Sequence, residues 1–174
     1  VKAAVDQFHR VVGQRDERVL HGVDQLGIMM LQELKDCLGL RFLGDVRFLQ
    51  TAEACANFYI ENTPEHGIAP NDWFEPEGGR PYESSAAAIA ASGLFNLATH
   101  TGDAARGHFY HEYALQIMDS LTEAEFLAVE TPGWEGVLKH GAYHEQLGLG
   151  VDESVMWGEY FFLEAVSKVL GHGQ

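Results

Sequence analysis

Apolar residues recur at steps of three and four along most of this chain, which is the period of an α-helix with one buried face. Five stretches carry such a stripe, whereas the alternation of apolar and polar residues that marks a half-buried strand is almost absent. We therefore expect an all-α fold. The stripes are Leu26, Met29, Met30, Leu34, Cys37 and Leu38; Phe48, Ala52, Cys55, Ala56 and Tyr59; Ile89, Gly93, Leu94 and Leu97; Tyr110, Ala114, Ile117, Met118 and Leu121; and Val155, Tyr160, Leu163, Val166 and Leu170.

Two Gly-Asp pairs separate neighbouring stripes, Gly44-Asp45 and Gly102-Asp103. Glycine can take the left-handed conformation that ends a helix, and aspartate can cap the first amides of the next one. The two pairs lie 58 residues apart. This spacing indicates repeated αα-hairpins, which stack into solenoids or toroids, although a simple helical bundle could also contain two hairpins.

The net charge of the chain limits the classes of partner that it is expected to bind. The chain has 11 Lys and Arg against 26 Asp and Glu, a formal net charge of −15. This argues against nucleic acid and anionic membranes as partners, and any anion site must be a local exception. No run is long and apolar enough to span a membrane. Cys37 and Cys55 fall on apolar helical positions, so we expect buried thiols, no disulfide framework and a cytoplasmic location.

Two long irregular stretches interrupt the helical pattern, one from 63 to 83 and one from 131 to 151. Both are rich in glycine or proline and both contain aromatic residues. Long structured loops in a compact helical domain often carry function, so we expect the ligand cleft to be built from these two.

Two interpretations are open for the polar residues at the ends of these stretches. Glu83 and Ser84 precede an alanine-rich run, where they either cap a helix or line a polar cleft. His140 and His144 have the spacing of two metal ligands on a helix, with Asp152 or Glu153 as a third. Gly141 argues against a regular helix there, so we expect no metal.

The aromatic residues nearby suit sugar recognition. Tyr143 and His144 lie together in the second stretch, and Trp157 follows it. Aromatic faces pack on sugar rings, and hydroxyl and imidazole groups bond to sugar oxygens. Asp152 has a simpler alternative role as a cap of the last helix.

Three motifs, in this order and spacing, resemble glycoside hydrolase family 88, the unsaturated glucuronyl hydrolases. They are Tyr-Glu-Ser-Ser-Ala-Ala-Ala-Ile-Ala-Ala at 82–91, His-Gly-Ala-Tyr-His at 140–144, and Gly-Val-Asp-Glu-Ser-Val-Met-Trp-Gly-Glu-Tyr-Phe-Phe-Leu-Glu-Ala at 150–165. The loop at 67–74 also fits the family. A related rhamnogalacturonyl hydrolase family shares the fold and remains an alternative.

The resemblance implies an (α/α)6 toroid, of which residues 1–174 would form a single helical domain, the C-terminal portion, amounting to about half of the ring. Residues 1–43 match the family poorly. The implied reaction is hydrolysis of a terminal Δ4,5-unsaturated uronic acid by hydration of its C4=C5 bond, with an unsaturated oligosaccharide as partner and with no metal or organic cofactor.

The family's two catalytic aspartates belong to its N-terminal half, so we expect them upstream of this chain. A rival alignment makes Asp24 the acid, although Asp24 can equally be an exposed charge on an amphipathic helix. The resemblance implies substrate contacts for Tyr143 first. Further candidates are His144, His140, Glu83, Ser84, Asp152 and Trp157.

Two other functions stay open at this point. One is an inactive helical scaffold that keeps the later hairpins and oligomerises through its exposed apolar surface, and the other is a sugar-binding module.

Overall fold

A computed structural model describes residues 46–71, 73 and 82–171. The predictions for the 26–38 stripe, Asp24, Cys37 and the turn at 44–45 lie outside these residues. The described elements are four α-helices and two strands, with one short 3-10 helix between the strands. They are α4 (Val46–Asn62), α5 (Ser84–His100), α6 (Ala104–Leu121), β1 (Gly141–His144), the 3-10 helix η2 (Glu145–Leu147), β2 (Leu149–Glu153) and α7 (Met156–Val169). The fold is therefore mostly helical.

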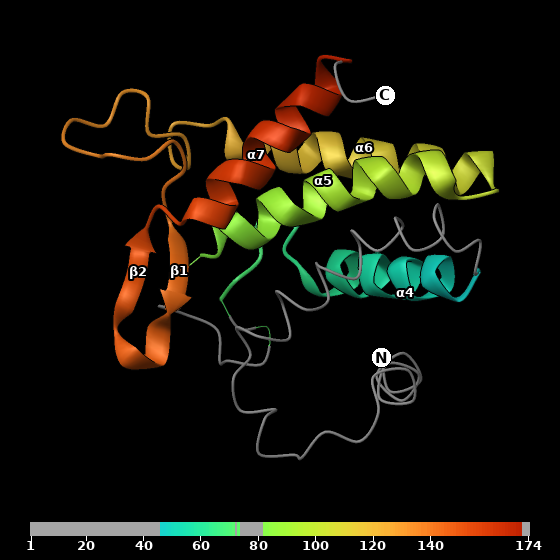
Figure 1. Ribbon diagram of the computed structural model, residues 1–174, viewed down its shortest axis with the longest axis horizontal. Helices are drawn as coiled ribbons and strands as arrows, with labels where there is room; N and C mark the ends of the chain where they lie inside the picture. Colours follow the sequence, from blue (N-terminus) through green and yellow to red (C-terminus); the bar gives the residue numbers. More distant parts are fainter. Residues whose placement is uncertain (1–45, 72, 74–81, 172–174) are drawn as a thin grey trace.

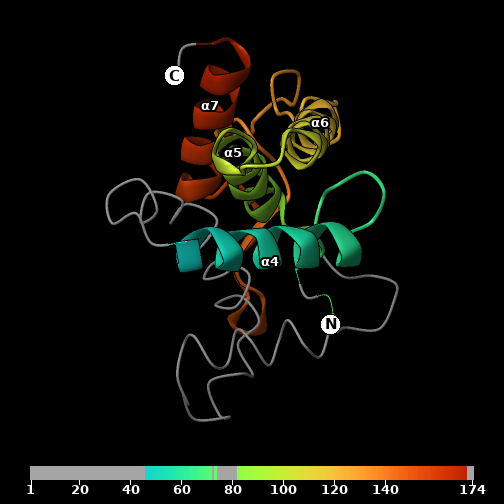
Figure 2. The ribbon, with the colours of Figure 1, turned by 90° about the vertical axis from the view of Figure 1, so that its right-hand side faces the viewer.

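Helix α5 is the centre of the structure. Almost all of its residues are buried, from Ser84 to Phe95, because its small side chains allow neighbours to approach on every side. Helix α6 runs back along it as the second half of an αα-hairpin, α7 crosses it, and α4 lies on a further side (Figure 1 and Figure 2). The helical stripes predicted for α4, α5 and α6 are the faces that meet here. The stripe predicted at 155–170 is wrong for three of its five members, because Tyr160, Leu163 and Leu170 are exposed. The buried residues of α7 are Gly158, Phe162 and Ala165.

At the predicted turn, the helix cap at Asp103 is confirmed, whereas the left-handed conformation expected at Gly102 is wrong. Asp103 caps α6, with its carboxylate accepting the amides of Ala105 at 2.9 Å and Arg106 at 3.2 Å. Gly102 does not take a left-handed conformation. Helix α5 ends instead at Thr101, whose extended backbone (φ −66°, ψ 135°) carries the chain out of the helix.

The expectation of an all-α fold needs a correction in the second irregular stretch. Strands β1 and β2 pair antiparallel there, with Ala142 opposite Val151 and His144 opposite Leu149. The strands have only four and five residues, and Gly148 turns the chain between them at a φ of 63°. Strands this short, interrupted by glycines, show no alternation that a sequence pattern could reveal.

The segment after α4 is anchored to that helix. The Tyr59 hydroxyl donates to the Gly67 carbonyl at 2.8 Å, and the Trp73 ring stands edge-on to those of Phe58 and Tyr59. Cys55 is buried in α4, as predicted. None of the described helices combines the length and apolar character that crossing a membrane requires.

Candidate functional site

The N-terminal ends of α5 and α7 meet β1 at one end of the helical layer (Figure 1). Residues from three separate parts of the sequence come together there. Glu83 precedes α5, Tyr143 lies on β1, and Trp157 lies in the first turn of α7. The structure thus brings three of the predicted site residues into one place.

Glu83 caps α5, as predicted, and does more than a cap requires. Its Oε1 accepts the Ser85 amide at 3.0 Å and the Ser85 hydroxyl at 2.6 Å. Its Oε2 accepts the Ala142 amide from β1 at 3.2 Å. Burial raises the pKa of Glu83 from 4.5 to about 7, although the hydrogen bonds from Ser85 and Ala142 oppose the shift. The side chain therefore changes charge near neutral pH.

Trp157 and Tyr143 form an aromatic pair at the surface. Their ring centroids lie 5.7 Å apart at an interplanar angle of 57°, and Tyr143 is 55% exposed. The Trp157 indole N–H donates to the Ser85 hydroxyl at 2.9 Å. Ser85 stands with Glu83 and Ser84 at the start of α5, where the sequence allows either a helix cap or the wall of a polar cleft. Its bond to Trp157 spans 72 residues, and no local pattern indicates it.

Close approach of α7 to α5 makes this bond possible. A Cβ added at Gly158 would lie 2.7 Å from the Cβ of Ser85. Real side chains do not approach this closely, so a glycine is needed where α7 crosses the start of α5. Ser85 itself is only 2% exposed, consistent with the tight contact.

His140 and Asp152 form a second pair, and Asp152 does not play its predicted role. The Asp152 carboxylate bonds to Nδ1 of His140, and both residues have a positive φ, 62° and 63°. The prediction that Asp152 caps α7 is therefore wrong. Val155 occupies the N-cap position of α7, and no side chain caps the helix there. Asp152 lies in β2 instead, as part of the hairpin.

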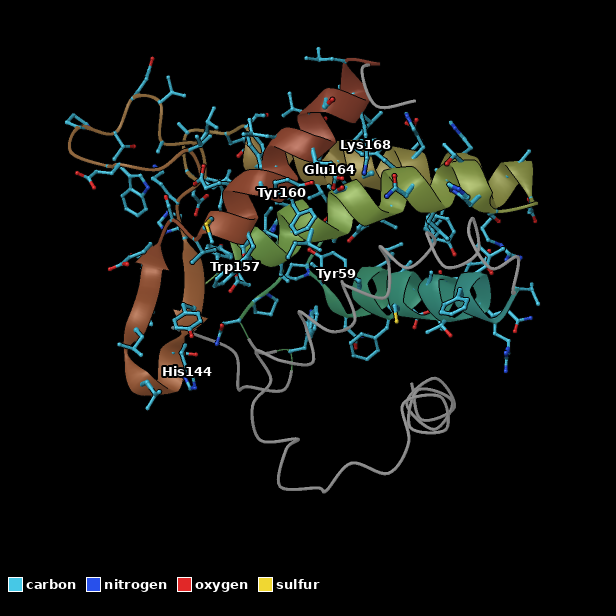
Figure 3. All side chains as sticks on the ribbon, viewed as in Figure 1. Tyr59, His144, Trp157, Tyr160, Glu164 and Lys168 are labelled. Atoms are coloured by element: carbon cyan, nitrogen blue, oxygen red, sulfur yellow. The ribbon has the colours of Figure 1, made fainter. Side chains whose placement is uncertain are left out.

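The remaining predicted residues in the described part of the chain are His144 and Ser84. His144 ends β1 next to the hairpin turn (Figure 3). Within the described part of the chain, no three metal-ligating side chains gather. Ser84 is buried, 1% exposed, and its amide donates to the His140 carbonyl at 3.1 Å.

A polar cluster deeper along the same helices fixes α7 on α5. The Ser92 hydroxyl donates to Glu164 at 2.5 Å, and Lys168 Nζ donates to the same hydroxyl at 2.7 Å and to the Ser92 carbonyl at 2.9 Å. Glu164 and Lys168 follow Trp157 along α7 (Figure 3). Helix α7, which carries Trp157, is therefore anchored to α5 at a second point beyond that residue.

A further carboxylate, which the sequence did not single out, holds the loop before β1. Glu159 Oε1 in α7 accepts the amides of Val137 and Leu138, each at 3.0 Å, and its Oε2 accepts the Val137 amide at 3.1 Å. In the same region the Trp134 indole donates to the Ser154 hydroxyl at 2.7 Å. The loop that leads into β1 is thus tied to the start of α7.

Comparisons with known proteins agree on one group of enzymes. An "Unsaturated glucuronyl hydrolase" of Formosa agariphila is 31% identical over 134 residues, 75% of this chain and 32% of that protein. The crystal structure of the unsaturated glucuronyl hydrolase from Bacillus sp. GL1 matches with a TM-score of 0.76 at 28% identity, over 83% of this chain and 39% of that one. No family model matches the sequence.

A third match carries a ligand. It is a variant of the unsaturated glucuronyl hydrolase from Streptococcus agalactiae complexed with dGlcA-GalNAc6S, with a TM-score of 0.71 at 26% identity, over 80% of this chain and 38% of that one. The chain spans about a third of the length of the curated relatives it matches. Over the three quarters of its own length that the alignments cover, the chain belongs to the unsaturated glucuronyl hydrolases, glycoside hydrolase family 88.

Proposed function

We propose that the complete protein hydrolyses oligosaccharides that end in a Δ4,5-unsaturated uronic acid, and that this chain supplies the C-terminal portion of its (α/α)6 toroid as a single helical domain. The observation that carries the proposal is the surface pair of Tyr143 and Trp157, on a chain related in sequence and fold to unsaturated glucuronyl hydrolases. The ligand in the Streptococcus agalactiae complex supports the same class of substrate.

The pair has the chemistry of a sugar subsite. An exposed tyrosine beside a half-buried tryptophan offers apolar surface to the C–H face of a pyranose ring, while the tyrosine hydroxyl can bond to a sugar oxygen. Tyr143 is also the position at which the family resemblance implies a substrate contact. His144 follows Tyr143 on β1 and His140 immediately precedes the strand, and their imidazoles are further candidates for contacts with sugar oxygens.

The acid that starts the reaction is assigned to the part of the protein that precedes the described residues. Hydration protonates C4 of the enol ether and adds water at C5, after which the hemiketal opens and releases the next sugar. Glu83 titrates near neutral pH, but three protein donors occupy its oxygens, so its role is to hold other groups rather than to transfer the proton. The family aspartates are expected upstream, and Asp24 stays the alternative within this chain.

The test is the absorbance of the enol ether at about 235 nm while the complete protein acts on unsaturated chondroitin or hyaluronan disaccharides. Loss of absorbance, slowed strongly by Tyr143→Ala, supports the proposal. Asp24→Asn then distinguishes the two assignments of the acid, since only the rival alignment expects this variant to be inactive. A folded protein that leaves the absorbance unchanged would refute the hydrolase.

One observation favours a second function, an assembly scaffold. Met156 and Leu163 on α7, and Leu170 at its C-cap, repeat every seven residues and are 80%, 58% and 64% exposed. Such an apolar stripe needs a covering partner. We propose that the remaining helices of the toroid cover it, whereas a scaffold without catalysis predicts a homo-oligomer that binds the disaccharides or forms assemblies but leaves the absorbance unchanged.

A further inference from the structure

A directed chain of hydrogen bonds connects Glu83 to Trp157. The indole N–H can only donate, so the Ser85 hydroxyl must accept from it at 2.9 Å. The single hydroxyl hydrogen of Ser85 is then left for Glu83 Oε1 at 2.6 Å. Each donor in this chain has one acceptor, and the carboxylate is where the chain ends.

The second oxygen of the same carboxylate reaches the other member of the aromatic pair. Glu83 Oε2 accepts the amide of Ala142, the residue that immediately precedes Tyr143 on β1. Each carboxylate oxygen of Glu83 is therefore linked to one of the two rings. Oε1 is linked to Trp157 through the Ser85 hydroxyl, and Oε2 is linked to Tyr143 through the backbone amide of Ala142. Glu83 and Ala142 are 59 residues apart in the sequence, so this contact joins two elements and not one turn.

We infer that Glu83 is a positioning residue whose carboxylate, through Ser85 on one side and the Ala142 amide on the other, sets the geometry of the Tyr143–Trp157 pair on which a substrate ring packs. This inference rests on the proposed function, because it gives the aromatic pair a ligand.

A helix cap alone does not account for these contacts. Capping α5 needs one oxygen of Glu83 on the Ser85 amide, which is present at 3.0 Å. The bonds to the Ser85 hydroxyl and to the Ala142 amide add nothing to the helix. They do, however, fix two rings that come from different elements and that would otherwise depend on side-chain packing at a surface.

Two substitutions break the chain at different places. Ser85→Ala removes the link to Trp157 and leaves both the cap and the Ala142 contact. Glu83→Gln keeps the shape, but an amide has one acceptor oxygen, so its NH2 group must face either the Ser85 donors or the Ala142 amide. Ser92→Ala is the matched control, a buried serine on the same helix that bonds to α7 at another point.

The first readout is the indole N–H resonance of Trp157 in the complete protein, assigned by its loss in Trp157→Phe. We expect Ser85→Ala and Glu83→Gln to shift this resonance and Ser92→Ala to leave it in place. The second readout is steady-state hydrolysis of an unsaturated chondroitin disaccharide. Loss of one ordering hydrogen bond predicts a KM about fivefold higher with kcat nearly unchanged, and Ser92→Ala should keep both constants.

The outcomes separate this inference from the proposed function. An unshifted indole resonance in Ser85→Ala, or a shifted resonance with an unchanged KM, overturns the positioning role. If the unsubstituted protein does not hydrolyse the disaccharide, the hydrolase proposal fails, and the indole resonance is then followed while the disaccharide is added. If the disaccharide shifts the indole resonance, and the shift is smaller in Ser85→Ala, Glu83 positions the pair for binding alone. If the disaccharide does not shift the resonance, the positioning role is overturned.

Discussion

Substitution of Gly158 by alanine tests whether the contact between α5 and α7 is as tight as the structure indicates. The new Cβ would lie 2.7 Å from the Cβ and 3.1 Å from the Cα of Ser85, and 3.4 Å from Cγ2 of Val155. Favourable carbon contacts begin at about 3.5 Å. The two atoms of Ser85 belong to or adjoin the backbone, so no flexible side chain can move aside, and α7 itself must shift by several tenths of an ångström.

Two opposing contributions decide whether Gly158→Ala lowers or raises the free energy of unfolding. Forcing an additional methyl group into a packed interface costs about 1–3 kcal/mol. Alanine in a helix gains about 1 kcal/mol over glycine. We expect the cost to exceed the gain because the polar cluster of Ser92, Glu164 and Lys168 fixes α7 further along and resists the shift. The net result is a loss of about 1 kcal/mol in the free energy of unfolding.

Urea unfolding of the complete protein, followed by far-ultraviolet circular dichroism, measures this loss. Gly102→Ala is the control, because nothing lies within 4 Å of its added Cβ and its φ is not positive. Its stability should match that of the parent. A Gly158→Ala variant as stable as the parent, or more stable, would refute the close approach of the two helices and, with it, the reason for a glycine at this position.

Three further predictions follow from the same contacts. Asp103→Ala removes the cap of α6 and should cost about 1 kcal/mol in unfolding free energy, most of which Asp103→Asn restores, measured by urea unfolding; equal loss in both variants would argue against capping. The pKa of Glu83, raised from 4.5 to about 7, means that the folded state binds this proton more tightly than the unfolded state. The contribution of this group to stability is complete below about pH 4.5 and is lost as the pH rises through about 7, by at most about 3 kcal/mol. The free energies of unfolding at pH 5.5 and pH 8 should therefore differ less in Glu83→Gln than in the parent. The same difference in both proteins would contradict the raised pKa. Tyr143→Ala should raise KM for an unsaturated disaccharide about tenfold through loss of roughly 1.4 kcal/mol of ring contact, and an unchanged KM would exclude Tyr143 from the sugar site.

The buried faces of α4, α5 and α6 and the caps of α5 and α6 could be predicted because their signals are local. The stripe of Tyr110, Ala114 and Ile117 repeats at helical spacing and forms the buried face of α6. Asp103 and Glu83 each bond to amides two or three residues ahead, so their neighbours in sequence are also their partners in space. The ordered motifs at 82–91, 140–144 and 150–165 were likewise sufficient to indicate the family.

The small sheet and the fate of Asp152 could not be predicted in the same way. Strands of four and five residues between glycines have no periodic pattern, and pairing decides their conformation. An aspartate shortly before a helix ordinarily suggests a cap. Here β2 and its bond to His140 take the side chain away from α7, and Val155 occupies the cap position.

The sequence by itself determined the helical character of the chain, the caps of α5 and α6, and the family to which the motifs belong, because each depends on residues that are close neighbours along the chain. Only the tertiary structure decided that Ser85 meets Trp157 across 72 residues and that Glu83 meets Ala142 across 59. The physical reason is that α7 packs on α5 through a glycine at 158, and the crossing of two helices selects which distant polar groups come within hydrogen-bonding distance.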